Sequence, residues 1–304
     1  MKRSRSRSPI SPVTAFFFLL SVALGVALYV KTRPHEERSA GRAPAPSRPE
    51  PAPAAPRARV VPTPRPRVFP SPRPPLASPG EPSATMRVAI LIDDLGNDSE
   101  AVGRIASWSF PVAGAVLPDL PGSERSAREL EASGKEVLLH LPMEPDGFPS
   151  VRPGPGVLLR AQNDDEIART LEKDLATVPG AVGVNNHMGS AATADPRVMR
   201  AVVRVLARRR LFFVDSRTTT ATVGERIARE EGVPCVSRRV FLDDVATEKG
   251  VEASFATLRA RARTEGVAVA IGHPHPATFA VLEREIPKLE REGIQLVRVG
   301  DLVK

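Results

Sequence analysis

The amino-acid sequence predicts an α/β domain built on a parallel sheet, either open or closed into a barrel. Apolar runs of strand length alternate with helix-like stretches from residue 86 to residue 304. The first run, "VAILI" at 88–92, lacks polar alternation, which indicates a strand covered on both faces. The later runs are "VAGAVL", "EVLLHLP", "VGVNN", "LFFVDS", "VPCVS", "VAVAIGHP" and "IQLVRV".

Helices are expected between these runs. Their core-facing positions are mostly Ala, Leu, Val and Ile, as on the buried face of an amphipathic helix. Helices are predicted at 123–133, 163–177, 195–209 and 276–292. After the first strand, Gly96 gives a turn, and Asn97, Asp98 or Ser99 is expected to cap the helix that follows.

Composition divides the chain into unlike parts. Residues 1–85 carry a net charge of +10 and residues 86–304 carry −2, so the basic character of the whole chain, +8, belongs to its N-terminal part. A nucleic-acid-binding domain carries its basic patch on the folded surface, so no nucleic-acid partner is expected. The single cysteine, Cys235, implies that there is no internal disulfide.

Residues 1–33 are predicted to be a cytoplasmic tip followed by a transmembrane signal-anchor. The basic "MKRSRSRS" precedes an apolar stretch of 18 residues at 13–30, which can just span a bilayer. Tyr29, Val30 and Lys31 stand where a signal peptide would have its small-residue cleavage site, so the anchor is expected to remain. The expected location is the inner (cytoplasmic) membrane, single-pass, with the rest of the chain on the periplasmic or extracytoplasmic side.

Residues 34–85 are predicted to be a disordered linker. This segment is rich in Pro, Ala and Arg and has too little apolar content for a core. It should behave as an extended, polyproline-type spacer. Residues 86–304 are long enough to form one sizeable domain, and we expect the catalytic groups there.

Reactive side chains gather at the carboxyl ends of the apolar runs in 86–304. Four of the five histidines in the chain have this position, together with three aspartates. The carboxyl ends of parallel barrel strands converge on one face, so these groups are expected to form a single site. The set is Asp93, Asp94, His140, His187, Asp215, His273 and His275.

Carboxylate and imidazole together suit zinc or a similar divalent ion. One aspartate and two histidines leave a coordination position open for water. The metal lowers the pKa of that water, a neighbouring carboxylate takes the remaining proton, and a histidine protonates the leaving group. The adjacent Asp93 and Asp94 suit this division, with one side chain turned to the metal and the other to the water.

Five motifs in this order and spacing resemble those of the divergent polysaccharide deacetylases, distant relatives of the chitooligosaccharide deacetylase superfamily. They are "IDDLG", "HLPMEP", "NNHMGS", "DSRTT" and "GHPHP", and they cover nearly all of 86–304. The resemblance implies an irregular (β/α) barrel of about seven parallel strands with surrounding helices. It also implies hydrolysis of an N- or O-acetyl group on a sugar with one metal ion. The expected partner is an acetylated polysaccharide such as peptidoglycan.

The resemblance also implies roles for individual residues. Asp93 resembles the catalytic base of the family, and Asp94 resembles its metal-binding aspartate. His140 falls where the superfamily has its first metal-binding histidine. The second such histidine usually lies four residues later, where this chain has Glu144. His187 is the candidate for the missing ligand, with Glu144 as the alternative, and zinc is the expected ion.

His273 best matches the late histidine that acts as the acid in the superfamily. Asp215 resembles a charge partner that orients such a histidine. Further candidates are expected to bind substrate or to support the site. They are Asn186, Ser190, Ser216 and His275.

Two functions of different classes are compatible with these features. The first is an active metal-dependent deacetylase of the cell envelope, and the second is a catalytically inactive carbohydrate-binding or scaffold protein. The aspartate pair and the histidines favour chemistry, because a sugar-binding groove relies on aromatic platforms and Trp108 is the only tryptophan. A serine hydrolase is disfavoured because the chain has no Gly-x-Ser-x-Gly motif.

Overall fold

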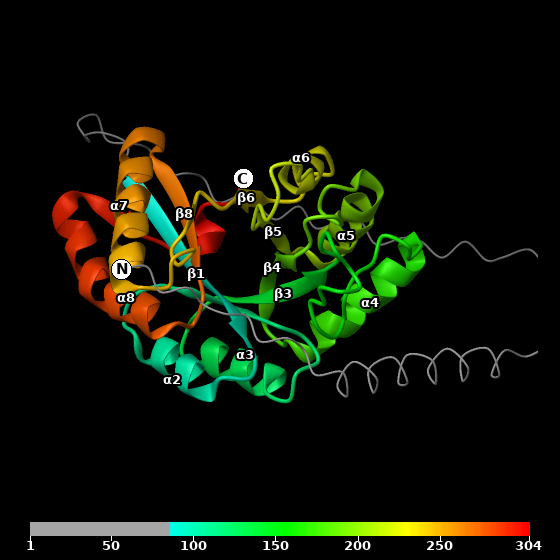
Figure 1. Cartoon of the computed structure of the whole chain (residues 1–304), viewed down its shortest axis with the longest axis horizontal. Coiled ribbons are helices and arrows are strands. Elements are labelled where there is room, and N and C mark those ends of the chain that lie inside the picture. Colours follow the sequence, from blue (N-terminus) through cyan, green and yellow to red (C-terminus); the bar gives the residue numbers. More distant parts are fainter. Residues whose placement is uncertain (1–85) are drawn as a thin grey trace, which may run out of the picture. The chain divides into compact units, whose positions relative to one another are not determined.

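The computed structural model describes residues 86–304, which form a nine-stranded parallel sheet with seven helices around it (Figure 1). The predicted anchor at 1–33 and the predicted linker at 34–85 lie outside the described residues. Within 86–304, none of the helices combines the length and the apolar character that a membrane span needs.

Every apolar run singled out in the sequence is a strand, and one further strand, β7, is very short. The strands are β1 Met86–Leu95, β2 Ala113–Val116, β3 Val137–Met143, β4 Ala181–Met188, β5 Phe212–Asp215, β6 Cys235–Ser237, β7 Val240–Phe241, β8 Val267–Gly272 and β9 Ile294–Leu296. The helices are α2 Ser99–Ser107, α3 Ser123–Ala132, α4 Asp164–Thr177, α5 Pro196–Arg209, α6 Gly224–Glu230, α7 Glu248–Glu265 and α8 Pro276–Leu289.

Local signals fix where several helices begin. The carboxylate of Asp98 accepts hydrogen bonds from the backbone N–H groups of Glu100 and Ala101, so Asp98 is the cap of α2 among the three expected candidates. Asn163 and Glu166 form a reciprocal capping box at the start of α4. These side chains satisfy N–H groups that the first turn of a helix leaves without an intrahelical partner.

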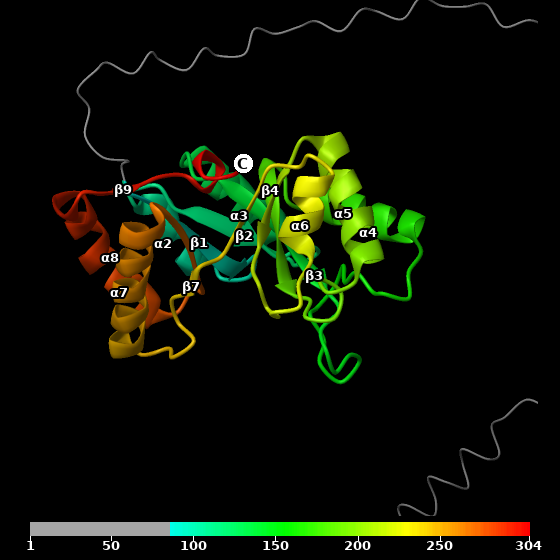
Figure 2. The ribbon, with the colours of Figure 1, turned by 90° about the horizontal axis from the view of Figure 1, so that it is seen from above.

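The strand order shows how the sheet curves into a barrel. It runs β6-β5-β4-β3-β2-β1-β8-β7, and β9 pairs with the first residues of β1. The edge strands β6 and β7 are linked by only Arg238 and Arg239. The N–H of Arg238 donates to Asp215 O on β5 (3.0 Å), and the N–H of Arg239 donates to Val269 O on β8 (2.8 Å). The link is therefore bonded to the sheet on both sides. The predicted barrel is therefore confirmed as an open one, with one gap between β6 and β7, which we call the seam. Helices α7 and α8 lie on one flank of the barrel, and α4, α5 and α6 lie on the other (Figure 2).

Side chains along the strands alternate between the helices and the interior of the barrel. On β1, Val88, Ile90 and Ile92 belong to the large apolar cluster that includes residues of the surrounding helices. Ala89 and Leu91 belong to a second cluster, which holds only strand residues and the C-terminal segment. The second cluster is the interior of the barrel, and it is filled mainly by small and branched side chains.

The amino end of the barrel is closed by two features. Phe212 projects into the interior against Gly183, where an added Cβ would lie 2.4 Å from the phenyl ring. The C-terminal segment then covers this end, because the carboxylate of Glu136 accepts hydrogen bonds from the N–H groups of Val299 (2.7 Å) and Gly300 (3.1 Å). The barrel is therefore a packed core at this end, and the polar site must lie at the other.

One buried carboxyl group lies away from the other polar residues. Asp174 on α4 is completely buried, and neither of its oxygens has a hydrogen-bond partner among residues 86–304. Gly156, in the connection between β3 and α4, packs so closely that a Cβ there would lie 2.4 Å from Asp174 Oδ1. Burial, with a smaller contribution from the charge of Asp119, raises the pKa of Asp174 to about 8.

This raised pKa makes the protein less stable as the pH rises. Between the unfolded-state pKa of 3.8 and the folded-state value of about 8, the unfolded chain releases a proton that the folded chain keeps. We predict that the free energy of unfolding of Asp174→Asn rises relative to that of the wild type as the pH increases. Within this window the rise is at most about 1.4 kcal/mol per pH unit. Denaturant unfolding at pH 4, 6 and 8 measures the difference.

The exposed Asp165 on the same helix provides the control. Asp165→Asn should change the free energy of unfolding by less than about 1 kcal/mol, the usual effect of a charge near a helix end. A stability difference between Asp174→Asn and the wild type that does not grow with pH would contradict the prediction.

Candidate active site

A polar layer lies on top of the apolar layers of the barrel interior, at the carboxyl ends of the strands. The interior of the barrel contains Leu91, Leu138, Val214 and Ile271. Because side chains alternate along a strand, the residue two positions after each of these also points inward. On β4, the residues that follow Gly183 at the same spacing also point inward. The layer consists of Asp93, His140, Asn185, His187, Ser216 and His273.

A bulge in β1 brings the neighbouring Asp94 into the same layer. Between Ile92 and Leu95 the register with β2 shifts, so three steps along β1 match two along β2. Asp94 has φ +59°, the left-handed conformation that non-glycine residues seldom adopt. Bulges next to active sites re-aim side chains in this way, and the strain is held by the surrounding structure. The bulge lets two consecutive carboxylates face one site.

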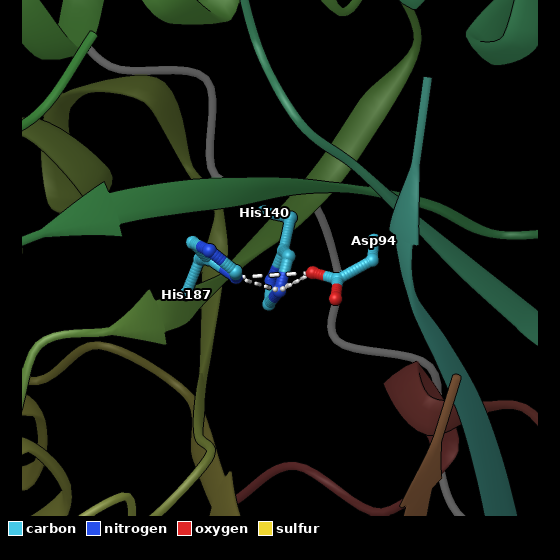
Figure 3. Close-up of side chains that lie close together, drawn as sticks. All are labelled: Asp94, His140 and His187. Carbon is cyan, nitrogen blue, oxygen red and sulfur yellow. Dashed lines mark hydrogen bonds and ion pairs between the residues drawn. The ribbon is translucent and has the colours of Figure 1, made fainter. Parts of the chain in front are cut away.

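Asp94, His140 and His187 form the tightest group in this layer, and their side chains converge from β1, β3 and β4 (Figure 3). Asp94 Oδ1 lies 3.2 Å from His140 Nε2 and 3.0 Å from His187 Nδ1. The two nitrogens are 3.1 Å apart. Two ligands bound to one zinc ion at about 2.1 Å lie roughly 3.4 Å apart in tetrahedral geometry, so this triangle has the size of one face of a zinc site.

The hydrogen bond of His140 on its far side sets its tautomer. His140 Nδ1 lies 3.0 Å from the side-chain oxygen of Asn185, which only accepts hydrogen bonds. Nδ1 therefore carries a hydrogen, so Nε2, which faces Asp94 and His187, is the nitrogen that can bind a metal when the ring is neutral. The amide nitrogen of Asn185 donates to Asp93 Oδ1 (2.9 Å) and to Ser216 Oγ (3.2 Å). Partners of this kind orient histidines that bind metals.

The chemistry of the three groups fits a divalent cation. Asp94 Oδ1 is buried and has no hydrogen bond of acceptable geometry, although two imidazole nitrogens lie within 3.2 Å of it. A buried carboxylate oxygen without a donor is costly unless a cation compensates its charge. Borderline imidazole and hard carboxylate ligands, with room for a further ligand, are typical of zinc sites. Asp94, His140 and His187 could therefore hold one ion.

His273 approaches the group from the end of β8, the strand that pairs with β1. Its Nδ1 lies 2.9 Å from Asp243 Oδ1, and its Nε2 lies 4.0 Å from Asp94 Oδ2. Asp243 Oδ2 accepts hydrogen bonds from the backbone N–H of His273 (2.6 Å) and from Thr278 Oγ1 (2.7 Å). Asp243 thus fixes His273 with Nε2 directed toward Asp94.

The surroundings give these groups different proton affinities. Burial raises the pKa of Asp93, against the opposing charges of His140 and His273. Burial acts in the same direction on Asp94, but the contacts with His140 and His187 hold the pKa of Asp94 far below its usual range. For His273 burial is also outweighed, because the hydrogen bond and charge of Asp243 raise its pKa to about 9. The layer therefore contains two neighbouring carboxyl groups with different proton affinities and a histidine that favours its protonated form.

Comparison with known proteins identifies the family. The model of the family described as divergent polysaccharide deacetylase matches residues 90–303, which is most of the chain. The chain belongs to the divergent polysaccharide deacetylase family. The resemblance of the five motifs is thereby confirmed.

Relatives of this member of the divergent polysaccharide deacetylase family occur in bacteria. An uncharacterized protein of Haemophilus influenzae Rd is 38% identical over 224 residues, which cover 72% of this chain and 77% of that protein. The uncharacterized protein YibQ of Escherichia coli K12 is 38% identical over 218 residues, covering 71% of this chain and 67% of that protein. A crystal structure of the uncharacterized protein ATU2773 of Agrobacterium tumefaciens C58 matches with a TM-score of 0.69 at 25% identity, covering 74% of this chain and 92% of that one.

One role expected from the resemblance is wrong. Asp215 does not contact His273, because alternation along β5 turns it toward the helices, as it does Phe213. Its carboxylate instead accepts hydrogen bonds from Thr222 Oγ1 (2.8 Å) and from the backbone N–H groups of Arg217 (2.8 Å) and Glu225 (3.2 Å). Asp243 takes the position that was expected for Asp215.

The alternative metal ligand, Glu144, is engaged elsewhere. Its carboxylate accepts a hydrogen bond from the backbone N–H of Arg160 (2.7 Å) and forms an ion pair with the guanidinium of the same residue (2.9 Å). Glu144 is also absent from the group of side chains whose ligand atoms lie close enough to share an ion. The geometry favours His187 over Glu144.

The residues expected to bind substrate hold the backbone in the structure. Asn186 accepts a hydrogen bond from the N–H of Ser216 and donates to Met188 O, both at 2.9 Å. Ser190 Oγ accepts one from the N–H of Asp146 (2.8 Å). His275 occupies the N-cap position of α8 but makes no capping hydrogen bond with its side chain, and its ring centroid lies 6.0 Å from that of His273. Binding of substrate by Asn186, Ser190, Ser216 and His275 remains a prediction.

Sequence reasoning missed two residues of the site. Asp243 lies in "VFLDD", which repeats the pattern of an apolar run followed by two aspartates in "ILIDD", but its run is too short to be recognised as a strand. Asn185 lies two positions before His187, so it shares a face with it, whereas Asn186 does not. Alternation counted back from His187 could have identified Asn185.

We predict that each residue of the triad is needed for metal binding. Asp94→Asn, His140→Gln and His187→Gln should each weaken zinc binding by more than about 100-fold, because loss of an outer partner of a ligand already costs 10- to 100-fold. Calorimetric titration of zinc into the metal-free protein measures the affinity.

Glu144→Gln is the matched control, because it changes a carboxylate beside the same strand end without touching the triad. Its zinc affinity should equal that of the wild type. If Glu144→Gln lost zinc and His187→Gln kept it, Glu144 would be the ligand.

Proposed function

We propose that residues 86–304 form a metal-dependent hydrolase that removes acetyl groups from a polysaccharide of the cell envelope, with peptidoglycan as the first candidate. One observation carries the proposal. His273 is held by Asp243 with Nε2 facing Asp94, which belongs to the three-residue group that could hold a cation. A hydrolase needs such an arrangement, with a proton donor aimed at the place where a cation polarises the substrate.

The family supports the substrate class. A divergent polysaccharide deacetylase acts on a sugar polymer, and the polar layer lies at the carboxyl end of the strands, where barrel enzymes bind substrate. A divalent ion held by Asp94, His140 and His187 would supply Lewis acidity, which polarises an acyl carbonyl and lowers the pKa of a water molecule.

The residues of the chain then perform the proton transfers. Asp93, whose pKa burial raises, takes a proton from the water as its oxygen attacks the acetyl carbon. Asn185 holds the Asp93 carboxylate in place by donating to Oδ1. His273, protonated at neutral pH, gives its Nε2 proton to the sugar nitrogen or oxygen as the acyl bond breaks. The products are acetate and a free amine or hydroxyl group on the sugar.

We predict that the acid–base groups and the ligands fail in different ways. Asp93→Asn should keep its zinc but release acetate roughly 10²- to 10⁴-fold more slowly, which is the usual contribution of a positioned general base. Acetate release from N-acetylated peptidoglycan, chitin and xylan fragments is the assay, with zinc content measured on the same samples.

Asp244→Asn provides the control, since Asp244 is exposed beside Asp243 and forms no ion pair in the described part of the chain. It should keep the wild-type rate. If the zinc-loaded wild type released no acetate from any of these fragments, a carbohydrate-binding protein without turnover would become the better interpretation.

We also propose that the domain works outside the cytoplasm, tethered by the expected signal-anchor at 13–30. The support is the sequence alone, with its basic tip and apolar stretch. A phosphatase reporter that is active only after export should be active when fused after Lys304 of the full chain. A fluorescent reporter that folds only in the cytoplasm should be dark there, and the opposite pair of results would reverse the topology.

A further inference from the structure

The seam leaves one side of the site without strand pairing. β6 pairs with β5, and β7 pairs with β8, but β6 and β7 do not pair with each other. His140, Asn185 and His187 form the half of the site on the β5 side of the seam, and Asp243 and His273 form the half across it, at the ends of β7 and β8. Away from the seam, four successive strand pairings connect the two halves, from β4 through β3, β2 and β1 to β8. A proton donor must keep a fixed distance from the metal ligands, since a displacement of about 1 Å can cost 10²-fold in rate.

The side chain of Arg238 spans this gap on the β5 side. Its Nε donates to Ser216 O (2.6 Å) and its Nη2 donates to Arg217 O (2.9 Å). Ser216 Oγ in turn accepts a hydrogen bond from Asn185, which holds both Asp93 and His140. Arg238 is therefore connected through Ser216 and Asn185 to the candidate metal ligand His140.

The same guanidinium contacts the other half. Its central carbon lies 3.7 Å from the centre of the Phe241 ring on β7. The Phe241 ring and the His273 ring are nearly parallel, with an interplanar angle of 25° and centroids 6.1 Å apart. Phe241 is in register with Ile271, two residues before His273, so both rings project into the interior. Arg238 and His273 are thus linked through one aromatic ring.

We propose that Arg238 is a positioning residue that fixes His273 relative to the candidate metal ligands His140 and His187 across the seam. The inference rests on the proposed function, in which His273 gives a proton to the leaving group of a substrate bound at those ligands. The planar guanidinium suits this place, because it makes two hydrogen bonds in its plane while its face lies on an aromatic ring. A lysine keeps the charge but cannot make both kinds of contact.

The first test compares variants in the acetate-release assay. Arg238→Gln should lower kcat by about 10- to 100-fold and leave KM and zinc affinity within about threefold of the wild type. Arg238→Lys should restore only part of the rate, and Phe241→Leu should resemble Arg238→Gln. The matched control is Arg239→Gln, because Arg239 points outward to Glu265 (3.1 Å) and is half exposed. It should keep the wild-type kcat.

The second test needs no substrate. In the wild type the Nδ1 proton of His273, bonded to Asp243, should give a slowly exchanging imidazole resonance, assigned by its loss in His273→Gln. Arg238→Gln and Phe241→Leu should broaden it by faster exchange, and Arg239→Gln should leave it unchanged. If the wild type releases no acetate, the proposed function fails, and this resonance still decides the role of Arg238.

Two outcomes would overturn the inference. One is an Arg238→Gln protein with the wild-type kcat and the wild-type imidazole resonance. The other is a parallel loss of zinc affinity, thermal stability and rate in both Arg238 variants, which would show that Arg238 only closes the barrel. Partial rescue of kcat by Arg238→Lys at full zinc affinity distinguishes positioning from such a general structural role.

Discussion

The interior of the barrel accepts every second side chain of each strand, and this selection decides which groups can meet. The lower layers are apolar and exclude water, so the interior positions at the strand ends form a single polar layer on a rigid base. Only Asp94 enters this layer against the alternation, and it does so through a bulge and a left-handed backbone. The candidate metal group depends on this bulge, because the bulge brings the carboxylate of Asp94 beside His140 and His187.

The two histidines on opposite sides of the layer differ through their hydrogen-bond partners. His140 is held by the neutral amide of Asn185, which fixes a tautomer and adds no charge. His273 is held by the carboxylate of Asp243, which favours its protonated form. In the proposed function, the same side chain acts as a ligand at one strand end and as an acid at another. The Nδ1 partner is an amide oxygen in the first case and a carboxylate oxygen in the second.

Much of the fold could be predicted from the sequence, because each apolar run that is long enough to be recognised contains a strand. The reactive groups lie at the carboxyl ends of these strands. The placement of Asp93, Asp94, His140, His187 and His273 followed from this rule. Asp215 did not, because a buried run such as "LFFVD" does not show which of its faces is the interior. Asp243 escaped notice because β7 has only two residues and is fixed by pairing with β8, a long-range contact that local sequence does not encode. The seam and Arg238 likewise depend on which strands become edges.

The position of Met86 has a consequence for how the domain reaches its substrate. Met86 begins β1 at the end of the barrel that Val299 and Gly300 cover, and Asp94 lies near the other end of the same strand. Eight residue-to-residue steps separate them, or about 26 Å at 3.3 Å per step. The chain therefore enters the domain at the end of the barrel that is farthest from the site. An attachment through Met86 would leave the site end free, so a long polymer could lie across the opening without steric interference from the attachment.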